Sequence, residues 1–321
     1  MMYLFKYVLK RIGLMLMTLF IIVGMCFFLV KLLPTTDLPQ HGQDMEIVLR
    51  RRELLGYNKP ILEQFYRFLK YAFQGNFGVG ETYKMGTEVW TVFTNRLPYT
   101  ITLNLITIII SIPVGLLLGI YAALKKNKWQ DHLISTSVMV VVSVPSFIYA
   151  FLIQYILYFK LGIASAVADT SQGAFSWTFI KSVYPAILAM SFGTIASFAR
   201  YTRAELTEVL TSEFMLLART KGLTRAQATV RHAMRNSMVP IFPMILGEFV
   251  SIMSGSLIIE QLFTIPGVGQ LYIGAINAQP TPDYNYFMLL TVFYTFIGLA
   301  AGIVIDISYG FIDPRIRMGA R

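Results

Sequence analysis

Six long apolar stretches, separated by polar segments, dominate the chain. Formal charge is almost absent from them. Their bounds are residues 12–30, 101–124, 133–159, 182–199, 239–259 and 284–305. A helix needs about 20 apolar residues to cross the hydrocarbon core of a bilayer, whereas a buried helix of a water-soluble protein needs about 10–14. The pattern therefore predicts an all-α polytopic membrane protein with six transmembrane helices.

The first apolar stretch reads as a retained helix. It is longer than the apolar part of a secretory signal peptide, which is about 7–15 residues, and the sequence KLLPT after it offers no small-residue cleavage site. We therefore divide the chain into three parts. Residues 1–33 hold the first span, residues 34–98 form a long loop, and residues 99–321 form a five-helix core with a polar loop at 200–238.

Composition supports a membrane protein and excludes several other classes. The 321 residues are 55% hydrophobic and 14% charged, with a mean hydropathy of +0.60. The formal charge of +10 could indicate nucleic-acid binding, but lysine and arginine also collect in cytoplasmic segments of membrane proteins. A single cysteine, Cys26, cannot form an internal disulfide. The three histidines lie in different segments, so no metal site is expected.

The short segments between the spans differ in basic content, and this difference predicts the orientation. More than half of the 27 lysines and arginines lie in the N-terminus, in the loops at 125–128 and 200–238, and in the C-terminus. The opposite segments, 160–183 and 260–283, hold only Lys160 and Lys181. The positive-inside rule then places both termini in the cytoplasm and the loop 34–98 outside, where long translocated loops are largely exempt from the rule.

The long loop contains one amphipathic pattern. In PILEQFYRFLKYA, apolar positions such as Ile61, Phe65, Phe68 and Leu69 follow helical spacing, and Pro60 suits a helix start. Two readings stay open for this helix. It lies on the membrane surface or on the outer ends of the spans, or it docks an extracytoplasmic partner.

Catalytic motifs are absent from the sequence. No GxxxxGK[ST], GxSxG or HExxH pattern occurs, so the chain carries no recognisable phosphate-binding or hydrolytic site. Polar residues within the spans are weak candidates for lining a transport pathway: Asn104, Gln154 and Glu248. Glu248, near the middle of the fifth stretch, keeps an ion-coupled carrier open as an alternative, although such carriers usually need several ionisable groups. A non-transporting membrane scaffold is a third alternative.

The loop between the fourth and fifth stretches contains residues that favour helix starts and helix ends at specific positions. Glu213 opens the segment EFMLLARTK, and Lys221 closes it, each with the charge that suits that helix end. Gly222 follows where a left-handed residue ends a helix, and Leu223 can supply the accompanying apolar contact. Thr224 and the residue three positions later form the capping box T-x-x-Q. We therefore predict helix, glycine turn, helix.

Helical spacing also predicts the faces of these two helices. Phe214, Leu217 and Ala218 share a face of the first helix, and Arg231 and Arg235 form a basic edge of the second. An apolar face of the second is expected at Ala226, Val230, Ala233 and Ser237. The physical pattern alone fits either a protein-docking element or an amphipathic hairpin resting on anionic headgroups.

Several segments resemble one transporter family. EFMLLARTKGLTRAQATVRHAMRNSMVPIF is similar to the cytoplasmic signature loop of ABC-importer permeases, and to the oligopeptide/dipeptide branch in particular. NRLPYTITL, IIEQLFTIPGVGQL and DISYGFIDPRIR match other segments of that branch in order along nearly the whole chain. Two departures stand out: LLA replaces the signature triplet EAA, and LPTTD at 33–37 replaces LPGDP.

The resemblance implies a type I ABC importer permease fold in the bacterial inner membrane. It implies a non-catalytic subunit that pairs with a second permease and two cytoplasmic ATPases, which would bind ATP and Mg²⁺. An extracytoplasmic binding protein would deliver peptide, although relatives also serve nickel, haem or glutathione. The implied ATPase-coupling residues are Glu213, Phe214, Leu217, Ala218, Lys221, Gly222, Thr224, Arg231 and Arg235. The implied outer motif, E-x-x-F-x-x-P-G-x-G, consists of Glu260, Phe263, Pro266, Gly267 and Gly269.

Overall fold

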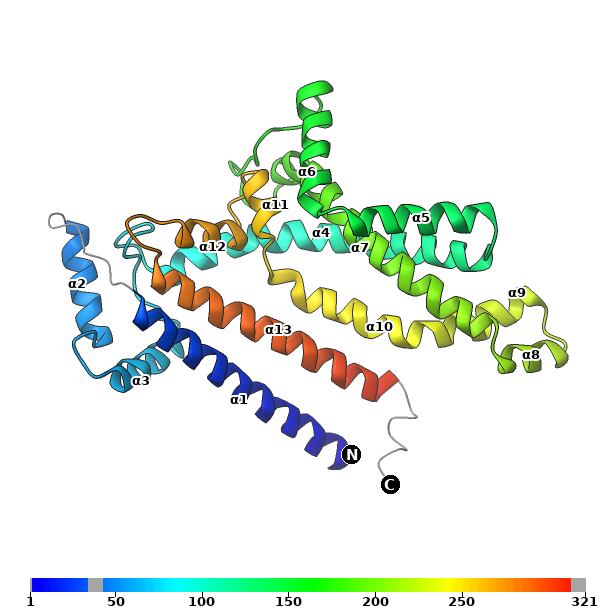
Figure 1. Cartoon of the computed structure of the whole chain (residues 1–321), viewed down its shortest axis with the longest axis horizontal. Coiled ribbons are helices and arrows are strands. Elements are labelled where there is room, and N and C mark those ends of the chain that lie inside the picture. Colours follow the sequence, from blue (N-terminus) through cyan, green and yellow to red (C-terminus); the bar gives the residue numbers. More distant parts are fainter. Residues whose placement is uncertain (1, 34–42, 313–321) are drawn as a thin grey trace. The chain divides into compact units, whose positions relative to one another are not determined.

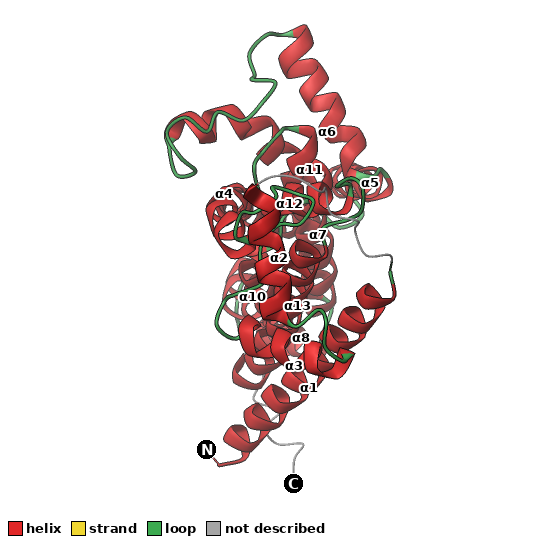
Figure 2. Cartoon of the chain, turned by 90° about the vertical axis from the view of Figure 1, so that its left-hand side faces the viewer, coloured by secondary structure: helices red, strands yellow, loops and turns green. Residues whose placement is uncertain are grey.

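The computed structural model describes residues 2–33 and 43–312, and within them the regular elements are helices (Figure 2). Only isolated β-bridges interrupt this pattern in the described part of the chain. The LPTTD departure falls largely outside the described residues, as do the C-terminal arginines at 315, 317 and 321. The predicted all-α class is confirmed.

The apolar helices of the described residues match the six predicted spans. Five single helices are long and apolar enough to cross a membrane, and a bent pair supplies the sixth span. The single helices run over Lys6–Leu32, Val89–Leu124, Trp177–Leu210, Arg225–Met253 and Tyr284–Ser308. Most are longer than the apolar stretches, because polar residues at their ends continue the helical hydrogen bonding.

The third span is broken, which differs from the single helix expected over 133–159. Helix α5 (Trp129–Ser143) ends at Val144, and α6 (Ser146–Gln154) continues as the π-helical η1 (Tyr155–Lys160). The two halves meet at 97° (Figure 1). Pro145 explains the break, because its ring disfavours the α conformation of the preceding residue. Val144 is accordingly extended, with φ −95° and ψ 126°.

The fourth and fifth spans also differ from their predicted bounds. Helix α7 (Trp177–Leu210) continues well past residue 199 into the polar loop. Helix α10 (Met234–Val250) is followed by a 3-10 turn, η3 (Ser251–Met253), and then by a non-helical segment before α11 (Leu257–Leu262). The stretch 239–259 is therefore not one helix. Glu248 lies in the last turn of α10 rather than at the middle of a span.

The chain forms two compact units, which we describe separately. Unit 1 comprises Met1–Ile101 and Met253–Ala300, and unit 2 comprises Thr102–Ile252 and Ala301–Arg321. Unit 1 holds α1 (Met2–Leu32), α2 (Gln43–Leu55), α3 (Ile61–Ala72), α11 and α12 (Val268–Ile276). Unit 2 holds α5, α6, α7, α10 and two short helices described below. Helices α4 (Val89–Leu124) and α13 (Tyr284–Ile312) contribute to both.

The amphipathic helix of the long loop packs within unit 1. The buried Phe65 of α3 contacts Phe27 and Phe28 of α1, with ring centroids 5.2 and 5.3 Å away. Met288 of α13 joins the same cluster. The apolar face of α3 is thus covered by the ends of two spans. This packing favours the first of the two readings of that helix.

A buried carboxylate, Asp283, anchors the start of α13. Its Oδ1 accepts the N–H groups of Asn285 and Tyr286 in the first turn of the helix, at 3.2 and 3.3 Å. Its Oδ2 accepts, at 2.7 to 3.0 Å, three consecutive backbone N–H groups, those of Glu81, Thr82 and Tyr83. The side chain is fully buried, and burial raises the pKa of Asp283. One residue therefore caps α13 and fixes the loop that precedes α4.

Unit 2 is built around tight contacts of α4, α7 and α10. Ile108 and Ile112 of α4, Phe198 of α7 and Ile241 of α10 form one buried cluster. Helix α5 packs along α7, and α6 contacts α7 as well. Pro240 and Pro243 lie inside α10, where the fold tolerates proline among closely packed helices.

We predict that Asp283→Ala destabilises unit 1 by at least about 3 kcal/mol, because it leaves five backbone donors without their acceptor in a buried site. Thermal unfolding of the purified protein in detergent measures the loss. The exposed Asp169, replaced by alanine, is the control and should unfold near the wild-type temperature. Equal unfolding temperatures for the two variants would contradict the anchor.

Candidate functional site

The polar loop forms a helical hairpin, residues 212–237, in unit 2 (Figure 1). Its first helix is α8 (Glu213–Thr220). The second begins as α9 (Arg225–Ala228), continues as the π-helical η2 (Thr229–Ala233) and runs on into α10. We call this segment the α8–α9 hairpin.

The turn of the hairpin has the geometry that the sequence predicts. Gly222 adopts φ +89°, in the left-handed region. The N–H of Leu223 donates to the carbonyl of Ala218 at 3.3 Å, and that of Gly222 donates to the carbonyl of Arg219 at 3.0 Å. These are the two bonds of a Schellman motif. Leu223 packs in the same apolar cluster as Ala218, which completes the motif.

The second helix begins with the predicted capping box. The Gln227 N–H donates to the Thr224 hydroxyl at 3.3 Å, and the Thr224 N–H donates to the Gln227 side-chain oxygen at 3.1 Å. A cap of this kind stabilises a helix by about 1 kcal/mol. Together with the Schellman turn, it holds the two helices in one mutual arrangement.

The inner face of α8 differs from the predicted grouping. Met215 and Ala218 are buried, whereas Phe214 and Leu217 are 37% and 56% exposed. The buried pair is spaced i, i+3, and it packs against Ala123 of α4. Phe214, Leu217 and Ala218 therefore differ in exposure although their spacing puts them on one side of α8, and sequence reasoning missed Met215. Its apolar side chain at helical spacing from Ala218 was the available signal.

The predicted face of the second helix is wrong for a structural reason. Ala226 and Val230 are exposed, whereas Ala228 and Ala233 are fully buried. The π turn of η2 inserts one extra residue, so the inner face advances by five positions from Ala228 to Ala233. Ser237, four residues further, is buried as well. A uniform helical period could not anticipate this shift.

The outward side of the hairpin is an apolar surface with a basic edge. Its large apolar side chains are 37% to 64% exposed: Phe214, Leu216, Leu217 and Val230. Around them lie exposed basic residues: Arg219, Lys221, Arg225, Arg231 and Arg235. An exposed apolar patch with a charged rim is typical of a protein-docking site. We call these nine residues the docking surface.

The outer motif forms a carboxylate cradle in unit 1. Glu260 of α11 is fully buried, and its carboxylate accepts the Thr100 hydroxyl at 2.8 Å and the Gln270 N–H at 3.0 Å. It also accepts the N–H of Gly269. Thr100 in turn accepts the N–H of Val268 at 2.8 Å. Helix α12 has no side-chain cap of its own, so Glu260 and Thr100 supply its N-cap from a distance.

The remaining motif residues make room for this cradle. A Cβ at Gly267 would meet the Glu260 carboxylate and the Thr100 hydroxyl, and a Cβ at Gly269 would meet Glu260 Oε2 at 3.0 Å. Phe263 is buried, and Pro266 is half-buried. The sequence resemblance singled out these motif residues as a site. Thr100 lies in the matching segment NRLPYTITL, but no role was assigned to it.

The three predicted pathway residues differ in their hydrogen bonds and burial. Asn104 donates to the Ile252 carbonyl at 2.8 Å, which supports the turn η3 that follows α10. Gln154 donates to the Ala166 carbonyl at 3.1 Å. Glu248 is half-buried. The two amides therefore each donate a hydrogen bond to the backbone, and the assignment of all three residues to a transport pathway stays a prediction.

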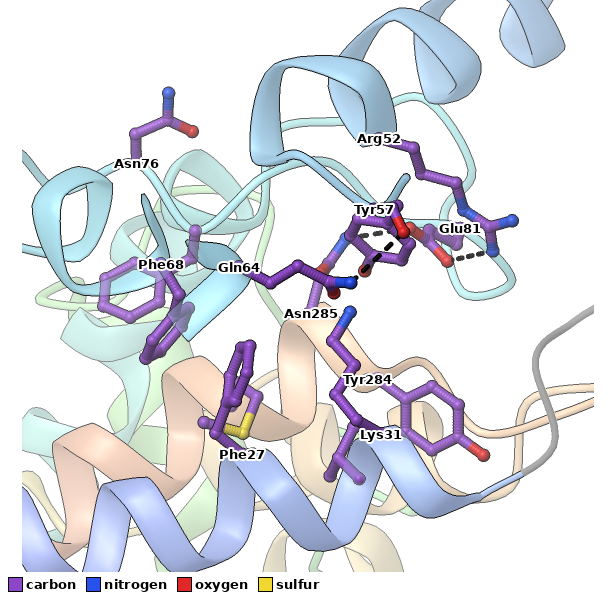
Figure 3. A pocket seen from close by; sticks show the side chains of 13 residues that line it. Phe27, Lys31, Arg52, Tyr57, Gln64, Phe68, Asn76, Glu81, Tyr284 and Asn285 are labelled. Carbon is purple, nitrogen blue, oxygen red and sulfur yellow. Dashed lines mark hydrogen bonds and ion pairs between the residues drawn. The ribbon is translucent and has the colours of Figure 1, made fainter. Parts of the chain in front are cut away.

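A cavity in unit 1 lies between the ends of α1, α3 and α13 (Figure 3). Its walls carry an ion pair between Arg52 and Glu81, and the Lys31 ammonium lies 3.5 Å from the centre of the Tyr57 ring. The cavity volume is about 50 Å³, which holds a few water molecules and excludes a peptide. No cluster of potential metal ligands occurs among the described residues.

Comparison with known proteins places the whole chain in one family. Residues 115–318 match the family described as "Binding-protein-dependent transport system inner membrane component", and residues 4–104 match its N-terminal counterpart. The chain belongs to this permease family. Its fold is therefore the type I importer permease fold, and it is a multi-pass inner-membrane protein.

Individual relatives cover nearly the full length of the permease. The dipeptide transport system permease protein DppB of Lactococcus lactis is 33% identical over 98% of this chain and 99% of its own. DppB of Bacillus subtilis is 31% identical over 98% of each chain. The oligopeptide transport system permease protein OppB of Salmonella typhimurium is 30% identical over 97% of this chain and 99% of its own. The resemblance to the peptide branch is confirmed.

We predict that Glu260 makes the stability of the permease depend on pH. Burial raises the pKa of Glu260 to about 7 from its ordinary 4.5, against the opposing effect of its hydrogen bonds. The folded state therefore binds an extra proton between these values, and stability falls by about 3 kcal/mol as the pH rises through them. Unfolding temperatures of the wild type and of Glu260→Gln, measured from pH 4.5 to pH 7.5, test this. A decline of the same slope in both proteins would refute the prediction.

Proposed function

We propose that this permease is the transmembrane subunit of an ATP-driven importer of peptides, which an extracytoplasmic binding protein delivers. The docking surface of the α8–α9 hairpin carries the proposal. The chain has no nucleotide-binding motif, so an energy source requires a partner and a surface that receives it. The names of the dipeptide and oligopeptide relatives support peptide as the cargo.

In this proposal two cytoplasmic ATPases bind ATP and Mg²⁺, and a second, homologous permease completes the pathway. Phe214 and Leu217 enter an apolar groove of an ATPase, and Arg231 and Arg235 contact its acidic rim. The apolar side chains contribute about 25 cal/mol for each Å² that docking buries. ATP-driven closure of the ATPase pair then moves the hairpins together and shifts the permeases between inward-facing and outward-facing states.

Coupling of this kind requires a stiff element with different contacts in the two states. The Schellman turn at Gly222 and the capping box at Thr224 supply the stiffness. The charge distribution supports the orientation: both termini and the hairpin lie in the cytoplasm, and the segment 43–98 of unit 1 lies outside.

Reconstitution in liposomes tests the proposal. We expect the purified permease alone to hydrolyse no ATP, and peptide uptake to require the second permease, the ATPases, the binding protein and ATP. Peptide uptake by this chain alone, driven by a proton gradient, would contradict it.

An ion-coupled carrier would depend on Glu248, which gives a second test. Under the proposal, Glu248→Gln keeps most of the ATP-dependent peptide uptake, because no proton needs to move through this carboxyl. Uptake by the reconstituted complex is measured with the two proteins at equal membrane content. Abolished uptake in a fully assembled complex would favour the carrier.

For the turn, we predict that Gly222→Val weakens ATPase binding or uncouples it from transport. A β-branched residue resists positive φ at a cost of about 1–3 kcal/mol. Gly173 is a matched control, because it has φ +84°, and a Cβ at either glycine would meet no atom within 4 Å. Gly173→Val therefore introduces similar strain away from the hairpin. The measurement is ATPase co-purification and ATP-driven uptake, and equal results for the two variants would count against the docking role of the hairpin.

A further inference from the structure

An ion pair between a buried carboxylate and a partly exposed guanidinium lies close to the α8–α9 hairpin in unit 2. Arg203 of α7 donates from Nε to Oδ1 and from Nη2 to Oδ2 of Asp131 on α5, at 2.5 and 2.8 Å. The Asn127 N–H and the Ser135 hydroxyl also donate to this carboxylate, at 2.9 and 3.3 Å. The Asp131 side chain is only 1% exposed. A two-pronged pair of this kind fixes the relative orientation of two helices more strictly than a single contact does.

Helix α4 meets α7 beside this pair, with almost no space between the two backbones. A Cβ at Gly119 would lie 2.6 Å from Thr202 Cβ and 3.1 Å from the Arg203 nitrogen. One turn earlier, a Cβ at Gly115 would lie 2.7 Å from Phe198 Cβ. This G-x-x-x-G arrangement lets two membrane helices approach closely. Helices α4 and α7 therefore cannot slide past each other without losing this fit.

The hairpin packs directly onto the same two helices. Met215 and Ala218 of α8 share a buried cluster with Ala123 of α4 and Leu206 of α7. Ala123 is one turn from Gly119, and Leu206 is one turn from Arg203. An unbroken series of contacts therefore runs from the hairpin through α4 and α7 to Asp131 on α5.

The apolar contacts between α5 and α7 contain no directional bond. Val138 of α5, with Ile134 and Val141 beside it, meets small side chains of α7, Ala196 and Ala199. The ion pair supplies a directional contact, and separating its partners would leave the buried Asp131 carboxylate without its cation. Helix α5 ends at the 97° break at Val144, so a movement of α5 also moves the middle of the third span.

We infer that Asp131 and Arg203 are positioning residues for energy coupling, which lock α5 to the α8–α9 hairpin so that both move as one body. The inference rests on the proposed function, because it concerns how movement of the hairpin enters the membrane. Loss of the pair leaves the docking surface intact and lets the hairpin move without α5. ATP is then hydrolysed without a corresponding movement of the pathway.

The first experiment uses the complete complex in liposomes. Asp131→Asn and Arg203→Lys should each assemble with the ATPases and raise the ATP hydrolysed per peptide imported by about fivefold or more. The double variant should resemble either single variant, since both remove the same interaction. Arg200→Lys is the matched control, because Arg200 is exposed on α7 less than one turn away, and its ratio should equal that of the wild type.

A wild-type ratio in assembled Asp131→Asn and Arg203→Lys complexes overturns the inference, as do strictly additive effects in the double variant. If Asp131→Asn lowers the yield of assembled complex, the ratio of ATP hydrolysed to peptide imported is judged from Arg203→Lys, because this variant keeps the positive charge. A wild-type complex that shows no ATP-dependent uptake would instead refute the proposed function, so the two failures are distinguishable.

A distance measurement tests the rigid connection without altering the pair. Spin labels are placed on cysteines at the exposed Trp129 of α5 and the exposed Thr220 of α8, with Cys26 replaced by serine. In the full complex we expect one narrow distance distribution that stays the same with and without ATP. A distribution that shifts on ATP binding while the Asp131–Arg203 pair is intact overturns the inference.

Discussion

Buried polar side chains hold several helix ends of this permease, and some of these side chains come from distant parts of the sequence. Glu260 and Thr100 satisfy the first turn of α12, and Asp283 satisfies α13 together with the loop at 81–83. Asn104 holds a carbonyl of the turn η3 that follows α10. Hydrocarbon offers no water to a free N–H or C=O, so partners of this kind stabilise helix ends in a membrane protein. These side chains therefore lie where the chain turns.

Local features of the structure could be predicted from the sequence. The Gly222 turn and the Thr224 capping box each lie within a few residues, so the pattern that specifies them can be read directly. The six spans follow from length and hydropathy alone. The buried faces of the hairpin could not be predicted in the same way, because the π turn at 229–233 changes the helical period. The break of the third span shows a related limit. Pro145 could be recognised in the sequence as a helix-distorting residue, but the 97° bend between the two halves of the third span could not be predicted from it.

Long-range pairs leave almost no trace in a single sequence. Thr100 and Glu260 are 160 positions apart, and Asp131 and Arg203 are 72 apart. The residues next to each of these four in the sequence do not indicate a partner, and only folding brings the paired side chains together. Resemblance to the peptide permeases directed attention to Glu260 and to the glycines after it. The resemblance gave no physical role to these residues. Their role follows from the burial of the Glu260 carboxylate and from the groups that donate hydrogen bonds to it.

The two units thus use buried charge for different purposes. In unit 1, Asp283 and Glu260 hold backbone N–H groups in place, whereas in unit 2 Asp131 and Arg203 hold two helices together. The cradle of Glu260 has an evolutionary consequence. The Glu260 carboxylate and the Thr100 hydroxyl together occupy the volume that a side chain at Gly267 would need. Gly269 is enclosed by the Ser256 backbone as well as by the carboxylate. A family member with a side chain at position 267 should therefore carry smaller residues in place of both Glu260 and Thr100, and its α12 should find another cap.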